Sequence, residues 1–320
     1  MRICIVGPGA MPIPPTGWGA VEILIWDYKQ TLERLGHDVV IVNTPNPYQI
    51  IEECNRSSAD FVHIQYDEYW QVCDYLNCKN VAITGHYAYL DQPAKHGGYY
   101  TGIINGFVST RSARVFALSE SNASQYTAKG MDPSRVVVVP NGVRTDLFRF
   151  DEECLLKDRS IYLAKIDQRK RQHLFQNING IDFVGNLANP DFNNHSNYLG
   201  EWNKPTLYSE LTKYANLVLL SDGEAHPLVC LEAMSAGLGL VVSEWATAHL
   251  DTTLPFIDVI PESKINDLVH VTAVIQENRN KSIGMRNDIR KYVTDNFSWK
   301  RIVNDYYIPA ILAETNNKLI

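Results

Sequence analysis

The sequence predicts an α/β protein made of two Rossmann-like, doubly wound domains that face each other across a cleft. Three observations carry this prediction. The chain has 320 residues, which suggests two domains at about 100–200 residues per domain. Short apolar runs alternate with amphipathic helical segments, a pattern typical of buried parallel strands. The pattern pauses near Phe150 and then starts again, so the chain divides into two α/β units.

The first unit, residues 1–150, opens with a strand at Ile3–Val6. A helix follows at Val21–Leu35, where apolar residues recur at helical spacing, and Gly36 ends it. Further apolar runs predict the other strands of this sheet: Asp38–Val42, Phe61–Ile64, Val81–Thr84, Arg114–Leu118 and Val136–Val139.

The second unit, residues 151–301, follows an acidic stretch at Asp151–Glu153 that is typical of a linker. Two helices, at about Arg286–Val293 and Trp299–Leu312, close the chain. The last of them, at about residues 302–320, could pack back on the first unit. Apolar runs predict five strands in the second unit: Ile161–Ala164, Ile181–Val184, Leu217–Leu220, Leu240–Val242 and Ile257–Ile260.

Charge and composition exclude several classes of protein. Lys and Arg number 29 against 36 Asp and Glu, a net charge of −7. Nucleic-acid binding needs clustered positive charge, so we expect no nucleic-acid partner. The most apolar long stretch, Leu228–Trp245, contains Glu232 and glycines, so no segment is expected to span a membrane. Peripheral membrane contact stays possible, although the acidic balance gives it no electrostatic support.

Cysteine usage and the first residues point to the cytoplasm. The six cysteines are scattered without C-x-x-C spacing, so we expect free thiols and no metal site. A strand begins directly after Met1 and leaves no room for a signal peptide. Cytoplasmic localisation is therefore the expectation.

The glycine-rich loop after the first strand allows two interpretations. Gly7 and Gly9 begin a dinucleotide fingerprint, but Pro12 stands where its third glycine would fall, which makes NAD binding a weak interpretation. The loop continues to Gly17 and Gly19 just before a helix, where glycine lets the backbone approach an anion closely. A flexible loop without a ligand fits these residues equally well.

A cluster of cations follows the first strand of the second unit. Lys165, Arg169, Lys170 and Arg171 lie within seven positions of an otherwise acidic chain. A diphosphate held at the carboxyl end of the strand would account for them. The alternative is a solvated helix start, although a helix N-terminus is the unfavourable end for cations.

Glu224 and Glu232 stand eight positions apart around the start of a predicted helix. Glu224 lies in the loop after a strand, Pro227 suits the first turn of the helix, and Glu232 lies inside it. The first backbone N–H groups of a helix are free to bind an anion, here those of Leu228, Val229 and Cys230. The sequence therefore predicts a pocket for a sugar diphosphate, with amides for phosphate and carboxylates for sugar and ribose hydroxyls.

His86 is a further candidate because it follows the strand Val81–Thr84 at the carboxyl end of the sheet. A lone histidine is more often a structural partner than a catalyst. His63, His226 and His249 are weaker candidates, although His226 lies between Glu224 and Glu232.

With these residues in place, the chain resembles the retaining glycosyltransferases of family 4, which have the GT-B fold of two facing Rossmann-like domains. Glu224–Gly237 resembles that family's E-x7-E signature, and Ala164–Lys170 is similar to its phosphate-binding segment, with Lys165 in place of an arginine. Shorter matches come in the same order along the chain: Gly17-x-Gly19-x-x-Glu22, Gly36-His37-Asp38-Val39, Ser119-Glu120, Asn141-Gly142-Val143 and Phe297-Ser298-Trp299.

The resemblance implies a role for each candidate. Glu224 would contact the transferred sugar, Glu232 the ribose, and Lys165 and Lys170 the departing diphosphate. His86 would face the sugar near the reacting carbon. Glu224, His86, Lys170 and Lys165 are thus the candidate catalytic residues. The donor-binding set is Gly17, Gly19, Lys165, Lys170, Glu224, His226, Pro227, Leu228, Val229 and Glu232.

The resemblance also implies a reaction: transfer of a hexose from a nucleotide diphosphate sugar to an acceptor hydroxyl with retention of anomeric configuration. Fixed cations and helix N–H groups would replace a metal ion, so no cofactor is expected. The acceptor would be a saccharide or a lipid-linked molecule, and the nucleotide UDP, GDP or another. Ala225 and His226 replace the family's usual Gly-Phe, Arg144 an aspartate and Gly239 a proline, which leaves the sugar open.

Three other functions stay open at this point. A catalytically silent glycan- or nucleotide-binding protein could keep the same scaffold without turnover. A sugar-nucleotide epimerase on the same fold would convert the donor without an acceptor. An NAD oxidoreductase is disfavoured by Pro12.

Overall fold

The computed structural model describes residues 1–15, 19–88, 92–110, 113–194 and 196–313. The chain forms two compact units, Met1–Gly142 with Trp299–Ile320, and Val143–Ser298. The second unit therefore begins earlier than the boundary near Phe150 suggested by the sequence. Val143 and Phe148 are buried in the core of the second unit. The acidic stretch after Phe150 consequently lies inside that unit.

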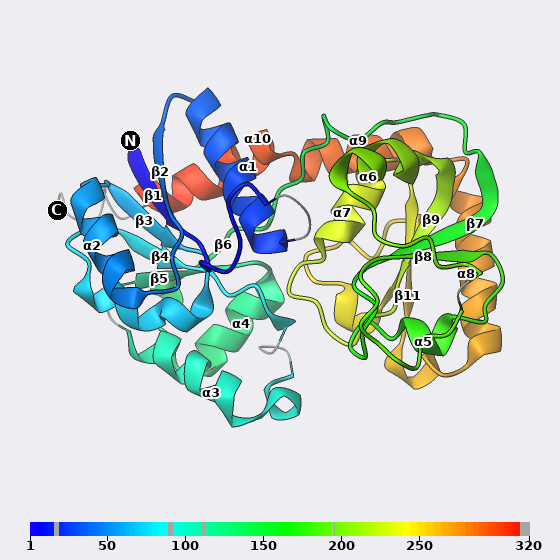
Figure 1. Ribbon diagram of the computed structural model, residues 1–320, viewed down its shortest axis with the longest axis horizontal. Coiled ribbons are helices and arrows are strands. Elements are labelled where there is room, and N and C mark those ends of the chain that lie inside the picture. Colours follow the sequence, from blue (N-terminus) through cyan, green and yellow to red (C-terminus); the bar gives the residue numbers. More distant parts are fainter. Residues whose placement is uncertain (16–18, 89–91, 111–112, 195, 314–320) are drawn as a thin grey trace. The chain divides into compact units, whose positions relative to one another are not determined.

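The first unit is built on a six-stranded sheet in which all neighbouring strands are parallel (Figure 1). The strand order is β2-β1-β3-β4-β5-β6. The strands are β1 (Arg2–Val6), β2 (Asp38–Val42), β3 (Phe61–Ile64), β4 (Val81–Ile83), β5 (Ala113–Ala117) and β6 (Val136–Val138). The helices are α1 (Ala20–Arg34), α2 (Pro47–Ser57), α3 (Pro93–Ser109) and α4 (Glu120–Ala128), with 3₁₀ turns η1 (Asp67–Tyr75) and η3 (Pro133–Arg135).

The strand order of the first sheet reverses between β1 and β3. From β1 the chain adds β2 on one side and then crosses over to add β3 on the other. Loops at the carboxyl ends of the strands diverge at such a switch point and leave room for a ligand. In this unit these are the loop that begins at Gly7 after β1, described over residues 7–15, and the turn that begins at Gln65 after β3.

The end of the chain packs on the first unit. It consists of α10 (Trp299–Ile302), a π-helical turn η7 (Val303–Tyr307) and α11 (Ile308–Leu312). The Trp299 ring lies 4.4 Å, centroid to centroid, from the ring of Tyr28 in α1, and α10 runs beside α1 in Figure 1. This late segment is therefore part of the first unit's core.

Two polar side chains fix the last helix on the same unit. Arg114 of β5 donates to the carbonyl oxygen of Ala310, and Asn80 donates to that of Ile311 at 3.2 Å. Carbonyl groups at a helix C-terminus have no partner within the helix. Arg114 is itself buried, so its bond gives a partner both to the guanidinium and to the carbonyl group of Ala310.

The sequence predicts one continuous helix over Trp299–Leu312, and the structure interrupts it. Pro309 has no N–H to donate to the carbonyl group four residues earlier. The π-helical turn over Val303–Tyr307 lies directly before this gap. Such single π turns widen a helix locally and change the direction of its side chains.

The second unit contains a five-stranded sheet, again with all neighbouring strands parallel. The order is β11-β10-β9-β7-β8. The strands are β7 (Leu156–Leu163), β8 (Ile181–Val184), β9 (Tyr214–Leu219), β10 (Gly239–Ser243) and β11 (Ile257–Ile260). The helices are α5 (Gln172–Phe175), α6 (Lys204–Glu210), α7 (Leu228–Ser235), α8 (Leu268–Ser282) and α9 (Arg286–Phe297), with 3₁₀ turns η4 (Leu211–Lys213), η5 (Glu244–Ala246) and η6 (Glu262–Lys264).

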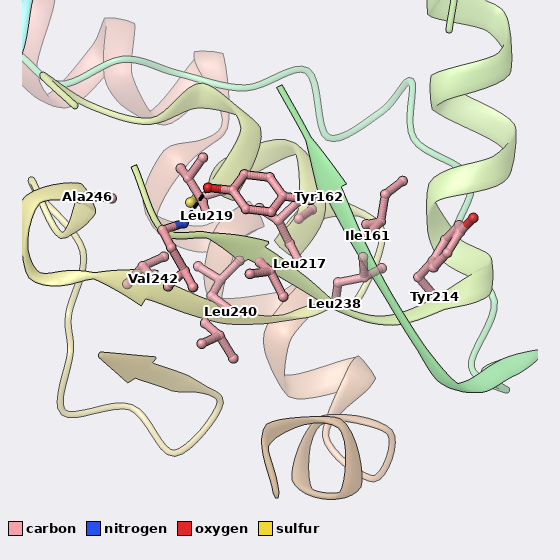
Figure 2. Close-up of a cluster of buried hydrophobic side chains, with 14 of the residues drawn as sticks. Ile161, Tyr162, Tyr214, Leu217, Leu219, Leu238, Leu240, Val242 and Ala246 are labelled. Atoms are coloured by element: carbon pink, nitrogen blue, oxygen red, sulfur yellow. Dashed lines mark hydrogen bonds between the residues drawn. The ribbon is translucent and has the colours of Figure 1, made fainter. Parts of the chain in front are cut away.

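Apolar side chains of the central strands form the core of the second unit. Figure 2 shows Leu217 and Leu219 of β9 beside Leu240 and Val242 of β10, with Tyr162 of β7 above them. All five are fully buried. Burial on both faces of a parallel sheet explains why these strands read as continuous apolar runs.

The second sheet has its own switch point, between β7 and β9. The chain adds β8 on one side of β7 and then crosses over to form β9 on the other. The loops that diverge there are residues 164–171 after β7 and residues 220–227 after β9. These two loops carry the lysines and the first glutamate identified in the sequence.

The predicted fold class, two Rossmann-like parallel α/β domains, is confirmed, and the predicted strands are all present. The largest difference is at β7, which begins at Leu156 and not at Ile161. The first half of β7 is mostly polar, so a search for apolar runs does not detect it. One of its polar residues, Arg159, forms an ion pair with Asp182 of the neighbouring β8.

Candidate functional site

The loop after β7 holds Lys170 in a fixed position. The backbone N–H of Lys170 donates to Oδ1 of Asp167 at 2.8 Å, and its carbonyl accepts a hydrogen bond from the Tyr162 hydroxyl. That hydroxyl also accepts from the backbone N–H of Leu220 at 2.9 Å (Figure 2). Tyr162 therefore ties the two loops of the switch point together beneath the lysine.

Lys170 and Glu224 form a buried ion pair at this switch point. The Lys170 ammonium donates to Oε1 of Glu224, and only 12% of each side chain is exposed. The Arg169 guanidinium approaches the same oxygen at 3.3 Å. Burial alone would raise the pKa of Glu224, but Lys170 and Arg169 outweigh it and hold that pKa below its usual value. Glu224 is consequently a charged carboxylate at neutral pH.

The loop after β9 places Glu224 next to a helix N-terminus. The backbone N–H of Glu224 donates to the carbonyl of Trp245 at 2.9 Å, which fixes the loop. Pro227 is the N-cap residue of α7, one position before the helix. The backbone N–H groups of Leu228 and Val229 have no hydrogen-bond acceptor among the described residues. They are available to an anion, as the sequence predicts.

One of the three expected amides is not available. The Cys230 N–H donates to the carbonyl oxygen of Pro227 at 3.0 Å. The first turn of α7 is tighter than an α-helical turn at this point, because the bond spans three residues. The expected anion site of α7 therefore has two backbone donors where the sequence suggests three.

Glu232 projects from α7 and is paired with a residue that sequence reasoning missed. The Lys204 ammonium lies 3.0 Å from Oε1 of Glu232, and the glutamate side chain is 18% exposed. Lys204 begins α6, directly after the N-cap residue Asn203. Nothing in its sequence neighbourhood marks it as part of the site.

The remaining cations of the loop have protein partners, with one exception. Arg171 pairs with Asp222 at 3.0 Å and with Glu262 at 2.6 Å. Lys165 is exposed, and its side chain makes no hydrogen bond or ion pair with a described residue. Three carboxylates, those of Glu224, Asp222 and Glu262, thus neutralise much of the cluster. The cations lie in the loop that leads into α5, whose N-cap residue is Arg171. The side chains of Lys170 and Arg171 are only 12% and 13% exposed, so these two are not the solvated cations that the helix-start alternative expects.

Three of the residues that depart from the family pattern, Ala225, His226 and Gly239, are buried. Ala225 and His226 are 6% and 5% exposed. The His226 ring packs edge-on against His249, with centroids 5.5 Å apart, and near Phe297 at 5.9 Å. A Cβ on Gly239 would fall 1.8 Å from the Ser282 hydroxyl, so α8 packs directly on β10 and leaves no room for a proline ring.

The candidates in the first unit lie at the carboxyl edge of its own sheet. His86 follows β4 and is partly buried. Its Nε2 atom lies 2.7 Å from Oε1 of Gln65, which follows β3. Burial lowers the pKa of His86 to about 4, so its ring is neutral at physiological pH. Gln65 is a site residue that the sequence analysis does not identify.

The glycine loop is only partly described. Gly19 is the N-cap residue of α1, with φ +135°, and its carbonyl accepts from the N–H of Ile23 at 2.9 Å. A residue with a side chain would be strained there. Gly17 lies outside the described residues.

Among the residues that the structure describes, no three His, Cys, Asp or Glu side chains are grouped as ligands of a metal ion. In the same part of the chain, every helix is too short or too polar to cross a bilayer.

Comparison with solved structures identifies the fold of the chain. No family model matches the chain, and no curated protein matches its sequence. Sucrose-phosphate synthase from Thermosynechococcus elongatus superposes with a TM-score of 0.76 at 14% identity, covering 99% of this chain and 98% of the synthase chain. HepE from Anabaena, in complex with UDP and glucose, gives 0.71 at 14% identity over the whole of both chains. AviGT4, a glycosyltransferase of avilamycin A biosynthesis, gives 0.71 at 15% identity over 98% of each chain. The chain therefore has the GT-B fold of these structures.

Proposed function

We propose that this protein is a retaining glycosyltransferase that moves a hexose from a nucleotide diphosphate sugar to an acceptor hydroxyl. One observation carries the proposal: the buried Lys170–Glu224 pair at the switch point of the second unit, beside the two available N–H groups of α7. A switch point with cations and helix amides suits a diphosphate. A charged carboxylate beside it suits sugar hydroxyls.

The ion pair gives Lys170 a role that changes when the donor binds. In the free protein the Lys170 ammonium neutralises the buried carboxylate of Glu224. Without Lys170, Arg169 is the cation that remains at this carboxylate. A diphosphate within reach of the Lys170 ammonium shares that charge. Lys165, exposed and without a partner among the described residues, supplies a second cation to the same group.

The reaction then balances without a metal ion. The bond between the sugar's anomeric carbon and the diphosphate oxygen breaks, and the negative charge that develops on that oxygen is stabilised by Lys165, Lys170 and the amides of Leu228 and Val229. The acceptor oxygen forms its new bond to the anomeric carbon on the same face, and its proton passes to the departing phosphate oxygen. Glu232 and Lys204 are left to hold the ribose.

UDP is the first nucleotide to test. HepE was crystallised with UDP, and also with UDP-glucose. TarM was crystallised with UDP, α-GlcNAc-glycerol and fondaparinux, a set that includes saccharides. These ligands belong to those proteins, and they support a UDP-sugar donor and a saccharide acceptor as starting choices here. A lipid-linked acceptor is the next choice.

The proposal is tested by proton NMR of the full chain with UDP-glucose, UDP-galactose, UDP-N-acetylglucosamine and the matching GDP and ADP donors. We expect one donor to be consumed, with an α-linked product from an α-linked donor and the same rate in EDTA. Slow hydrolysis in the absence of an acceptor should release the α anomer first. A β product would refute retention. Donor epimerised without release of nucleotide would favour the epimerase, and binding without turnover the silent protein.

A further inference from the structure

A chain of buried polar side chains in the first unit leads from the last helical segment to His86. The Tyr307 hydroxyl of η7 lies 3.1 Å from Nδ1 of His63 in β3. Nε2 of Gln65 lies 3.1 Å from the same nitrogen, and Oε1 of Gln65 lies 2.7 Å from Nε2 of His86. His63 and Gln65 are each 1% exposed, and Tyr307 is fully buried. Among the described residues, Gln65 is the only hydrogen-bond partner of the His86 ring.

One backbone carbonyl group determines which atom donates in each hydrogen bond of this series of side chains. The carbonyl oxygen of Phe116 can only accept, so the Thr84 hydroxyl, 3.2 Å away, is its donor. The same hydroxyl oxygen then accepts from Nε2 of His63 at 2.9 Å. His63 therefore carries its proton on Nε2. Burial, with the neighbouring His86 and Arg114, holds the pKa of His63 well below its usual value, so the ring is neutral and Nδ1 is an acceptor.

An unprotonated Nδ1 on His63 decides how the Gln65 amide is oriented. Two donors point at this nitrogen: the hydroxyl of Tyr307, whose pKa burial raises, and the amide NH₂ of Gln65. With its NH₂ directed at His63, Gln65 presents its carbonyl oxygen to His86. An amide oxygen can only accept, so Nε2 of His86 must be the donor.

We propose that Gln65 is a positioning residue that holds His86 as its Nε2–H tautomer, so that His86 offers the Nδ1 lone pair to a hydroxyl group of the substrate. In this form His86 accepts a hydrogen bond at Nδ1 and cannot donate one there. It therefore recognises a sugar hydroxyl and not a phosphate or carbonyl oxygen. The use of His86 in a sugar site rests on the proposed function, whereas its tautomer is a property of the free protein.

The tautomer is measured directly by long-range ¹H–¹⁵N NMR of the full chain labelled on its histidines. His86→Asn identifies the His86 signal by its loss. We expect the neutral Nε2–H pattern for His86 in the wild type at neutral pH. The Nδ1–H pattern, or fast exchange between both, would overturn the proposal whether or not the protein proves to be a transferase.

Two substitutions of Gln65 separate positioning from packing. Gln65→Leu removes the acceptor, and we expect the Nδ1–H tautomer of His86 to appear and kcat to fall about tenfold to a hundredfold with little change in KM for the donor. Gln65→Glu keeps an acceptor, so the Nε2–H tautomer should persist while the added charge raises the pKa of His86.

The exposed Gln71 of η1 is the matched control, and Gln71→Glu should change neither the His86 signal nor the rate. An unchanged His86 tautomer in Gln65→Leu would overturn the proposal. If Gln65→Leu does not fold, Gln65→Glu still decides, because loss of the Nε2–H pattern there contradicts the assignment. Absence of any transfer with a correct tautomer would instead count against the proposed function alone.

Discussion

Lys170→Met should lower kcat/KM for sugar transfer by about a hundredfold to a thousandfold, the cost of removing one charge-stabilising donor from an active site. Lys170 is 12% exposed and contacts Glu224. In the proposed site, its loss removes the fixed charge beside the departing diphosphate. Steady-state kinetics with the identified donor measure the effect. Lys213→Met is the control: it lies in the same unit, pairs with Glu210 near the surface, and should leave the rate unchanged.

The same substitution has a structural cost that must be separated from the chemical one. Without Lys170, the buried Glu224 keeps only Arg169, at 3.3 Å, as a cationic partner. We expect about 1–3 kcal/mol lower stability, the usual penalty for a buried polar group that loses its partner. The double variant Lys170→Met/Glu224→Gln removes the unpaired charge as well. It should regain most of the stability and none of the activity.

Recovery of activity in the double variant would contradict the assignment, since it would mean that Lys170 only neutralises Glu224. So would an effect of Lys213→Met as large as that of Lys170→Met. Either result would mean that the diphosphate does not bind at the β7–β9 switch point.

Arg286→Met should destabilise the second unit by about 3–5 kcal/mol, because several buried carbonyl groups lose their donor at about 1–3 kcal/mol each. Arg286 is 2% exposed and donates to the carbonyl oxygens of Asp151, Thr212, Tyr214 and Ala236. Methionine fills similar space but leaves these oxygens without donors. These carbonyls belong to three separate stretches of the unit, so the guanidinium holds residue 151, the start of β9 and the end of α7 together.

Denaturant unfolding followed by circular dichroism, with hydrogen exchange to locate the change, measures this loss. Exchange should accelerate in β9 and α7 and stay unchanged in the first unit. Lys291→Met is the control on the same helix: Lys291 forms an exposed pair with Asp295, and such pairs contribute about 1 kcal/mol or less. Equal stability of the two variants would show that the Arg286 network does not hold the unit together.

The strands and the position of the site could be predicted because both depend on local patterns. A parallel strand buried on both faces is a continuous apolar run, as Leu217–Leu220 is, and glutamate in the loop after it must lie at the carboxyl edge of the sheet. The Lys170–Glu224 contact joins loops 54 positions apart. The two loops meet because β7 and β9 are neighbours in the sheet, and no local sequence pattern predicts that strand order.

The features that sequence reasoning missed depend on tertiary contacts. Lys204 meets Glu232 only because α6 and α7 come together in the folded unit. The ion pairs of Arg171 with Asp222 and Glu262 likewise join distant segments, so the cation cluster looked unneutralised in the sequence. Packing of the last helix on the first unit is anticipated from the sequence, but no spacing rule identifies the buried rings that make this contact, such as Trp299 against Tyr28.

Isothermal titration calorimetry of UDP into the full chain tests whether the diphosphate site is built around Lys170. We expect saturable binding at one site that weakens about tenfold or more in Lys170→Met, since a lost charge-assisted contact is worth about 1.5–3 kcal/mol. Uridine, which has no phosphate, should bind both proteins equally, and Lys213→Met should bind UDP as the wild type does. Equal UDP affinity in the wild type and Lys170→Met, or no saturable binding of UDP, GDP or ADP, would contradict this placement of the site.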